Sequence, residues 1–416
     1  MKKTLTVATL LAASAVQAAG FNIDTQGSRA TGMSTAVTGF IDDASAVYYN
    51  PAGILGVKKL DIQVGDTGII PRIAFTPSEG LGAGVKYNQE FTVSPPPHFY
   101  GVYRLTEKLA VGAGVMVPFA ARSQWEDGFV GSTRGKVSRF AAWHLNPTVA
   151  YEPIKRVRLG AGVDLVRATI HIKRDQPAPM DPGNELELGG GAWGIGFNAG
   201  AQVDVVERYL SLGVSYRSQI SLNFDGSAHF NGVPPALATL LADQPITGAV
   251  RLPTTVNIGL ASRPVDNLTL AFDLGYVRWS DFPELFFNFE NDALDRPVRK
   301  NWEDTVNYHL GGEYAFTDKF AARLGFMYDP TPSPKADTTT PPPPGTAPQS
   351  TLGPDLPDAD RYKVSVGAGF KFTENIGVDA AYQFLYLHAT KTDIPGLPGT
   401  FDGTAHVISA TFKYQM

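Results

Sequence analysis

The sequence predicts an all-β fold, a 14-stranded antiparallel transmembrane β-barrel with an N-terminal hatch, or plug, in its lumen. The composition is rich in Gly (43), Phe (24) and Tyr (16), yet only 43% of the 416 residues are hydrophobic, which is the mixture that a barrel wall needs. From about residue 58 to the end, apolar residues alternate with small or polar ones. The links between these alternating segments are short and long in turn, as in outer-membrane barrels.

The chain begins with the features of a signal peptide. Lys2 and Lys3 give a positive start, residues 4–15 are apolar, and Val16-Gln17-Ala18 places small residues at the −3 and −1 positions of a cleavage site. A membrane-spanning helix needs roughly 20 apolar residues, more than this stretch offers. We therefore expect residues 1–18 to be removed after Ala18 and the mature chain to leave the cytoplasm.

Residues 19–57 do not alternate and are rich in Gly, Ala, Ser and Thr, with turn signals at Asp42-Asp43 and at the motif Asn50, Pro51, Ala52. The segment is either a disordered leader or a plug. Barrels of 16–18 strands leave a water channel, so one of fourteen strands needs something in its lumen if it is not to leak. This reasoning favours the plug, and we expect residues 19–57 to form the hatch.

Residues 58–416 supply the strands of the barrel. In residues 268–276, for example, the Leu, Phe and Tyr side chains share one face, and Thr, Ala, Asp and Gly share the other. The same period predicts strands at 58–76, 95–105, 109–120, 137–153, 157–173, 189–206, 209–225, 248–263, 268–281, 302–317, 319–330, 360–373, 375–389 and 403–416. The long links predicted between them are 77–94, 121–136, 174–188, 226–247, 282–301 and 331–359.

Two of these strands carry special features. In the third, Gly112 and Gly114 weaken strand pairing and Pro118 cannot donate a hydrogen bond, so Pro118 marks either a kink or an ordinary strand end. The last strand carries aromatic residues on its apolar face, the signal that barrel-insertion machinery usually reads. Met416 stands where an aromatic last residue is commoner.

Several other classes of protein are disfavoured. No run of 18 apolar residues follows the signal peptide, cysteine is absent, and a net charge of −5 does not suggest a nucleic-acid partner. We find no G-x-S-x-G elbow, no metal-ligand spacing, and a G-x-G-x-x-G match at 189–194 that lies inside an alternating strand. We expect no enzyme activity, no cofactor and no metal; an outer-membrane hydrolase and a structural or adhesive protein remain the alternatives to transport.

An ordered set of motifs resembles the FadL/TodX family of outer-membrane transporters of hydrophobic compounds. The motifs are Ala19-Gly20-Phe21, DDAS and NPAG within 42–53, LNPTVAYEPIKRVRLGAGVD at 145–164, and the runs at 252–282, 301–329 and 357–382. The resemblance implies a Gram-negative outer membrane, a hatch inside a 14-stranded barrel, and passive diffusion of a hydrophobic ligand. We expect the chain to be a monomer.

The resemblance also implies a route for the ligand. Capture between external loops is followed by binding beside the hatch N-terminus, where Phe21 and Ile23 would contact the ligand, and by lateral exit at a kink in the third strand. In the loop 226–247, Leu237, Leu240 and Leu241 fall at helical spacing. They would form either a capture lip or a contact between loops.

The choice of substrate depends on cations in the lumen. A fatty acid needs a cation for its desolvated carboxylate, whereas a monoaromatic hydrocarbon does not. The alternation predicts five inward cations, each of which pairs with a lumenal acid such as Asp164, Asp273, Glu313 or Asp379 or clamps a carboxylate: Arg158, Arg217, Arg251, Arg323 and Lys371. We expect long-chain fatty acids, with monoaromatic hydrocarbons as the alternative.

Overall fold

The computed structural model describes residues 20–80, 82–176, 184–295, 298–335 and 351–416. The predicted signal peptide, 1–18, lies outside these residues. The wall is formed by β1 (Leu60–Pro77), β2 (Tyr87–Asn88), β3 (Pro97–Thr106), β4 (Leu109–Gln124), β5 (Val137–Ile154), β6 (Val157–Asp175), β7 (Glu185–Val206), β8 (Leu210–Arg217), β9 (Ile220–Asn231), β10 (Gln244–Leu252), β11 (Thr254–Val265), β12 (Leu268–Arg278), β13 (Glu284–Phe289), β14 (Val298–Arg299), β15 (Thr305–Ala315), β16 (Phe320–Asp329), β17 (Arg361–Lys371), β18 (Ile376–Thr392) and β19 (Gly399–Gln415).

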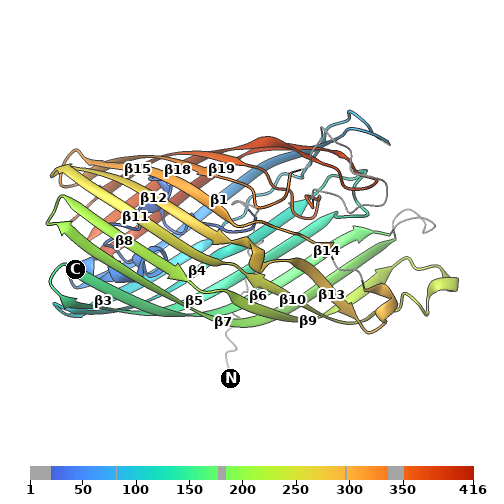
Figure 1. The fold of residues 1–416 in the computed structure, drawn as a ribbon, viewed down its shortest axis with the longest axis horizontal. Helices are drawn as coiled ribbons and strands as arrows, with labels where there is room; N and C mark the ends of the chain where they lie inside the picture. The colour runs from blue at the N-terminus through green and yellow to red at the C-terminus, as the bar shows by residue number, and fades with distance from the viewer. Residues whose placement is uncertain (1–19, 81, 177–183, 296–297, 336–350) are drawn as a thin grey trace, which may run out of the picture.

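These strands close into an antiparallel barrel, shown in Figure 1, because β1 pairs with β3 on one side and with β19 on the other. At three positions of the wall, two strands follow one another along the same line: β8 and β9, β10 and β11, and β12 and β13. β8 and β9 both pair with β7, β10 pairs with β9 and β13, and β11 pairs with β8 and β12. The wall therefore has fourteen positions, and the predicted fold class is confirmed.

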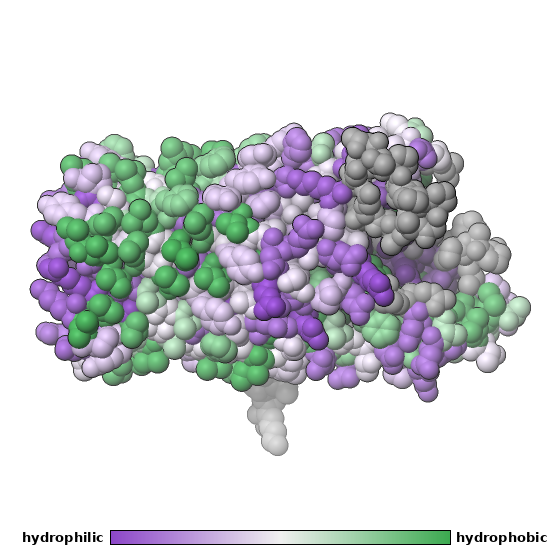
Figure 2. Space-filling model, viewed as in Figure 1, coloured by the Kyte–Doolittle hydropathy of each residue, from purple (hydrophilic) through white to green (hydrophobic). Residues whose placement is uncertain are grey.

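Alternation sorts the side chains of each strand between the two faces of the wall. In β12, Leu270 and Phe272 are exposed on the outside, whereas Thr269 and Asp273 are buried inside. Figure 2 shows the exposed apolar side chains gathered over the end of the barrel that carries the C-terminus, with a more polar surface towards the opposite end. An apolar band of this kind suits the hydrocarbon core of a bilayer.

Residues 20–57 lie inside the barrel. They form two single helical turns, α1 (Ser28–Thr31) and α2 (Ala46–Tyr49), and the 3-10 helix η1 (Pro51–Gly56), joined by irregular chain. None of the helices that the structure describes is long and apolar enough to cross a membrane. The segment touches the wall on opposite sides, since Gly32 lies against Gly367 of β17 and Pro51 against Gly160 of β6. We use the name hatch for residues 20–57.

Ion pairs and hydrogen bonds, as well as packing, hold the hatch against the wall. Arg29 donates to Asp42 at 2.6 Å and to Glu313 of β15 at 3.0 Å, and Asp273 of β12 accepts from the backbone N–H groups of Val37 (3.0 Å) and Thr38 (2.8 Å). Glu313 and Asp273 of the wall thus find partners on the hatch, which satisfies them where water is excluded.

Several strands extend further than the sequence indicates. β7 begins at Glu185 inside the predicted loop 174–188, and β9 and β10 reach Asn231 and Gln244 inside the predicted loop 226–247. Two more predicted loops contain the short strands β2, β13 and β14. These extensions lie beyond the apolar band, where neither face of the sheet needs an apolar residue, so the period-two signal fades while the backbone pairing continues.

One predicted side-chain direction is wrong. Arg251 was expected to point into the lumen but is exposed, while its neighbours Val250 and Leu252 are buried in the interior. The reason is Pro253, which separates β10 from β11 and shifts the alternation by one residue, so that Thr255 of β11 faces inward again. Proline lacks the N–H group that a continuous ladder needs.

Candidate ligand site

The first residues of the hatch lie along an open edge of β4. Pairing of β3 with β4 ends at Val115, and beyond it the pairing of β4 with β5 shifts register between Met116 and Phe119. Two residues, Val117 and Pro118, therefore stand opposite one residue of β5, which is a β-bulge. A bulge bends its strand, and here it takes β4 away from β3 and leaves one edge of β4 unpaired by the wall.

Hatch residues 21–26 pair with this edge instead. The Ile23 N–H group donates to the Pro118 carbonyl at 2.6 Å, and Ala120 N–H donates to the Phe21 carbonyl at 2.9 Å. The Gln26 side chain donates to Val117 O at 2.9 Å and accepts from Val117 N at 3.3 Å, much as a strand residue would. The hatch N-terminus thus takes the place of a neighbouring strand along this short edge of β4.

Phe21 anchors this segment in a cluster of aromatic rings. Its ring centroid lies 5.1 Å from that of Trp279, 5.2 Å from Phe282 and 5.4 Å from Phe140, all in edge-to-face geometry. A cavity of about 60 Å³ opens beside these rings and is lined largely by apolar side chains, namely Phe21, Ala121, Phe140, Ile170, Val250 and Leu285. An aromatic, largely apolar cavity is suited to an apolar ligand.

One fully buried cation reaches the same cavity, which the half-buried Arg139 also borders. Lys300 is 1% exposed, and its Nζ lies 2.6 Å from Oδ2 of Asp355, which also lines the cavity. The Ser138 hydroxyl, a further lining group, has no hydrogen-bond partner among the described residues. Sequence reasoning missed Lys300 because it lies in the segment 282–301, where no alternation assigns it to a face.

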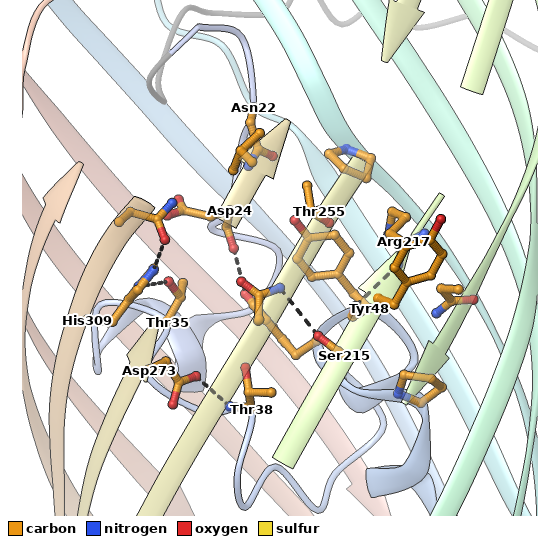
Figure 3. A pocket seen from close by; sticks show the side chains of 18 of the residues that line it. Asn22, Asp24, Thr35, Thr38, Tyr48, Ser215, Arg217, Thr255, Asp273 and His309 are labelled. Carbon is orange, nitrogen blue, oxygen red and sulfur yellow. Dashed lines mark hydrogen bonds between the residues drawn. The ribbon is translucent and has the colours of Figure 1, made fainter. Parts of the chain in front are cut away.

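A second, more polar chamber lies between the hatch and the wall, and Figure 3 shows its lining. Asn22, Asp24 and Tyr48 of the hatch face Arg217, Thr255 and His309 of the wall. Arg217 pairs with the fully buried Asp164, and its guanidinium lies over the Tyr48 ring at 5.3 Å. The chamber has its own charge balance and a polar lining, so it is less suited to an apolar ligand than the cavity at Phe21.

The other predicted lumenal cations are also placed by the structure. Arg158 pairs with Asp204 at 3.2 Å, and Arg323 pairs with Glu313 and Asp379, both at 2.6 Å. Lys371 is exposed at the mouth of the barrel near the C-terminus, where it borders a cavity of about 930 Å³. Asp273, expected as an ion-pair acceptor, instead caps backbone N–H groups of the hatch.

The three leucines of the predicted capture loop do not share one surface. The 3-10 helix η2 (Pro235–Leu237) takes the place of a longer helix, and of the three only Leu240 is clearly exposed, while Leu241 is buried. None of them lines the apolar cavity. Leu237, Leu240 and Leu241 therefore do not form one apolar surface for ligand capture.

The remaining predicted residues have structural surroundings. Asn50 caps η1 by accepting from Ala52 N at 3.2 Å, and its Nδ2 donates to Thr38 O at 2.9 Å and Ala201 O at 3.1 Å. Pro51 begins η1. Gly112 and Gly114 lie in the part of β4 that still pairs with β3. The register shift itself begins after Met116.

An external loop holds the start of the hatch. Asp358 is buried in the loop before β17, where it pairs with Arg361 and accepts from Gly20 N at 3.1 Å and from Thr331 Oγ1 at 2.6 Å. Burial raises the pKa of the Asp358 carboxyl, against the opposing effect of Arg361. Among the described residues, no group of three or more His, Asp or Glu could hold a metal ion.

Comparison with known proteins identifies the family to which this chain belongs. Residues 9–416 match the family model described as outer membrane protein transport protein (OMPP1/FadL/TodX). This chain belongs to the OMPP1/FadL/TodX family. It is thus an outer-membrane protein, and the family transports hydrophobic small molecules across that membrane.

Individual members of the OMPP1/FadL/TodX family are similar along most of their length. A 47 kDa outer membrane protein of Pasteurella multocida is 27% identical over 90% of this chain and 88% of its own, and a long-chain fatty acid transport protein of Escherichia coli K12 is 23% identical over 99% and 98%. The solved structure of a Pseudomonas aeruginosa FadL homologue has a TM-score of 0.83 at 19% identity, covering 95% of this chain and 100% of that one. The Pseudomonas putida toluene transporter TodX has 0.73 at 16%, covering 96% and 99%. These likenesses support the fold.

Proposed function

We propose that this protein admits long-chain fatty acids, which bind in the cavity beside Phe21 and leave sideways through the wall at the β4 bulge. The observation that carries the proposal is the combination, in one cavity, of an aromatic lining with a buried lysine. A fatty acid has the same two parts, an apolar tail and an anionic head. The relatives named as long-chain fatty acid transport proteins support this choice.

The aromatic lining provides the affinity for the tail. Each methylene removed from water contributes about 0.8 kcal/mol, so even four or five of them bound here outweigh the cost of ordering a flexible chain end. The cavity of about 60 Å³ is smaller than a whole acyl tail. A long ligand therefore has to displace part of the lining, and Phe21, on a segment attached to the β4 edge by few hydrogen bonds, is the side chain most easily moved.

Lys300 provides a partner for the carboxylate. The ammonium already pairs with Asp355, whose side chain is partly exposed and thus free to turn towards solvent. A fatty acid carboxylate that replaces Asp355 at Lys300 would keep the buried charge neutral, and the unpartnered Ser138 hydroxyl offers a further hydrogen bond. In this proposal the carboxylate partner is Lys300 and not one of the lumenal arginines, since Arg158, Arg217 and Arg323 do not line the apolar cavity.

Lateral exit follows from the way the hatch N-terminus closes the β4 edge. A ligand that displaces Phe21 loosens residues 21–23, and with them the two backbone hydrogen bonds to Pro118 and Ala120. The edge at the bulge then opens between β4 and the chain that precedes β3. An apolar ligand passing there enters the bilayer and not the periplasm, which spares it from crossing water.

The test is binding of oleate to the purified protein and uptake of labelled oleate by a deletion strain that carries each variant. We expect Lys300→Met to weaken oleate binding about tenfold, the loss of one charge-assisted contact, and Lys300→Arg to retain most of it. Arg251→Gln removes an exposed arginine on the outer wall and serves as the matched control. Equal oleate binding by wild type and Lys300→Met would overturn the assignment of the carboxylate site.

Monoaromatic hydrocarbons are the second candidate, and one observation favours them. The cavity is close to the size of a single ring and is lined by Phe21, Phe140 and Phe282, which suit edge-to-face contact with an aromatic ligand. Toluene would use this lining without Lys300. Toluene uptake that depends on the protein and is unchanged in Lys300→Met, with no oleate uptake, would establish this candidate instead.

A further inference from the structure

The outer face of the wall carries two arginines directly opposite each other. Arg122 of β4 is the register partner of Arg139 of β5, and the Nη2 atoms of both donate to one acceptor, Oε1 of Gln124, at 3.1 and 3.0 Å. The adjacent residues Ser123 and Ser138 are buried on the inner side, so the alternation directs both arginines outward. Arg139 also borders the apolar cavity, but its guanidinium bonds on the opposite face.

The charge of this pair is not balanced by an ion pair within the described part of the chain. Like charges directly opposite on a sheet destabilise it, and no carboxylate among the described residues lies at ion-pair distance from either guanidinium. The Nε atoms of Arg122 and Arg139 are buried without a hydrogen-bond partner. The acid nearest in the hydrogen-bond network, Glu90, accepts from the amide of Gln124 and attracts Arg122 from beyond ion-pair distance. Two neighbouring positive charges without an ion-pair partner make this surface a candidate for binding an anion.

The neighbours of the pair set its depth in the membrane. Four residues further along β5 than Arg139, Trp143 is the register partner of Arg167, which in turn pairs with Trp193 on β7 and lies over its ring at 5.4 Å. Trp193 is 73% exposed, and the next outward residues, Leu145, Leu165 and Ile195, are exposed and aliphatic. Tryptophan marks the interface of a bilayer, so the arginine pair, four residues closer to the long loops, lies outside the hydrocarbon.

We propose that Arg122 and Arg139 bind a phosphate group of the anionic glycolipid in the outer leaflet, with its acyl chains along Leu145, Leu165 and Ile195. A phosphate matches the site better than a single carboxylate does, because it brings up to two negative charges and three acceptor oxygens to two forked donors. Arg167, with no ion-pair partner among the described residues, stands at the same border and offers a third contact. The bound lipid would stand beside the β4 bulge.

The experiment measures binding of lipid A to the folded, detergent-purified full chain by native mass spectrometry. The probes are bisphosphorylated lipid A, the same lipid after removal of both phosphates, inorganic phosphate and oleate. We expect R122Q/R139Q to bind bisphosphorylated lipid A at least about tenfold more weakly than wild type, and R122K/R139K to lose less. The matched control, K155Q/R208Q, removes two charges from turns at the other end of the barrel and should bind as wild type does.

The other probes separate the possible sources of the anion. Phosphate-free lipid A should bind wild type and R122Q/R139Q equally, and millimolar inorganic phosphate should not displace the bound lipid. Unchanged binding of bisphosphorylated lipid A by R122Q/R139Q would overturn the proposal, and so would a loss confined to oleate, which would assign the pair to the departing carboxylate. The heat-dependent gel mobility of the barrel reports folding; if the double variant does not fold, Arg139→Gln alone is tested by the same measurement.

Discussion

At the scale of single residues, the lumen shows how buried charge is tolerated. Asp164 of β6 is fully buried, where it pairs with Arg217 and accepts hydrogen bonds from His144 at 3.2 Å and Asn146 at 3.1 Å. A buried charge without a partner costs several kcal/mol, so such groups persist only in networks. The hatch makes this network necessary, because it displaces the water that would otherwise hydrate these side chains.

Removal of one member should therefore be costly. We expect Arg217→Met to lower the free energy of unfolding by about 3–5 kcal/mol, because Asp164 would remain buried without its cation. Arg158→Met is the matched control: its partner Asp204 is partly exposed, so the loss should stay within about 1 kcal/mol. Urea unfolding of the refolded barrel in detergent measures both; equal losses would show that solvent reaches Asp164.

At the scale of elements, the fit of hatch to wall depends on glycines whose missing side chains admit hatch backbone. A Cβ atom at Gly213 of β8 would overlap the Thr38 carbonyl, and one at Gly160 of β6 would overlap Pro51. Both overlaps involve backbone, which cannot rotate away as a side chain can. Glycines on inward positions of the wall are thus part of the hatch site, a role that glycine content alone did not reveal.

A pair of alanine substitutions tests this fit. Gly213→Ala should destabilise the protein by about 1–3 kcal/mol, the cost of overpacking a tight contact, and should shift the hatch enough to raise hydrogen exchange in residues 32–57. Gly189→Ala is the control, since a Cβ there meets nothing within 4 Å, and should stay within about 0.5 kcal/mol. Urea titration and hydrogen-exchange mass spectrometry measure the two effects. Equal behaviour of the two variants would contradict the proposed fit.

At the scale of the whole molecule, different parts of the hatch block the lumen and close the lateral path. The wall is wide enough to need a filler, and the hatch fills it from the C-terminal end of the barrel up to Phe21. Only the first residues of the hatch, 21–26, reach the bulge in β4. The rest, from α1 through η1, blocks the lumen, so opening of the lateral path does not require the whole hatch to move.

This division predicts different results for two deletions. Removal of residues 20–57 behind an intact signal peptide should give a barrel with a large, steady single-channel conductance in planar bilayers, because fourteen strands without a filler leave an aqueous lumen. Removal of residues 20–26 alone should leave conductance near that of wild type and abolish oleate binding. High conductance in the short deletion would mean that residues 21–26, and not the later helices, seal the pore.

The sequence by itself determined the barrel, because a wall between lipid and a packed lumen imposes a period of two on every strand, as Leu270 and Asp273 of β12 illustrate. It also determined that residues 19–57 differ from the rest. The tertiary structure decided where single side chains lie: Pro253 reversed the direction of Arg251, and Lys300 joined the cavity from a segment without periodicity. Alternation is a local property of the sequence. A binding site is made by residues far apart in the chain that come into contact only when the sheet closes, so a local pattern does not predict it.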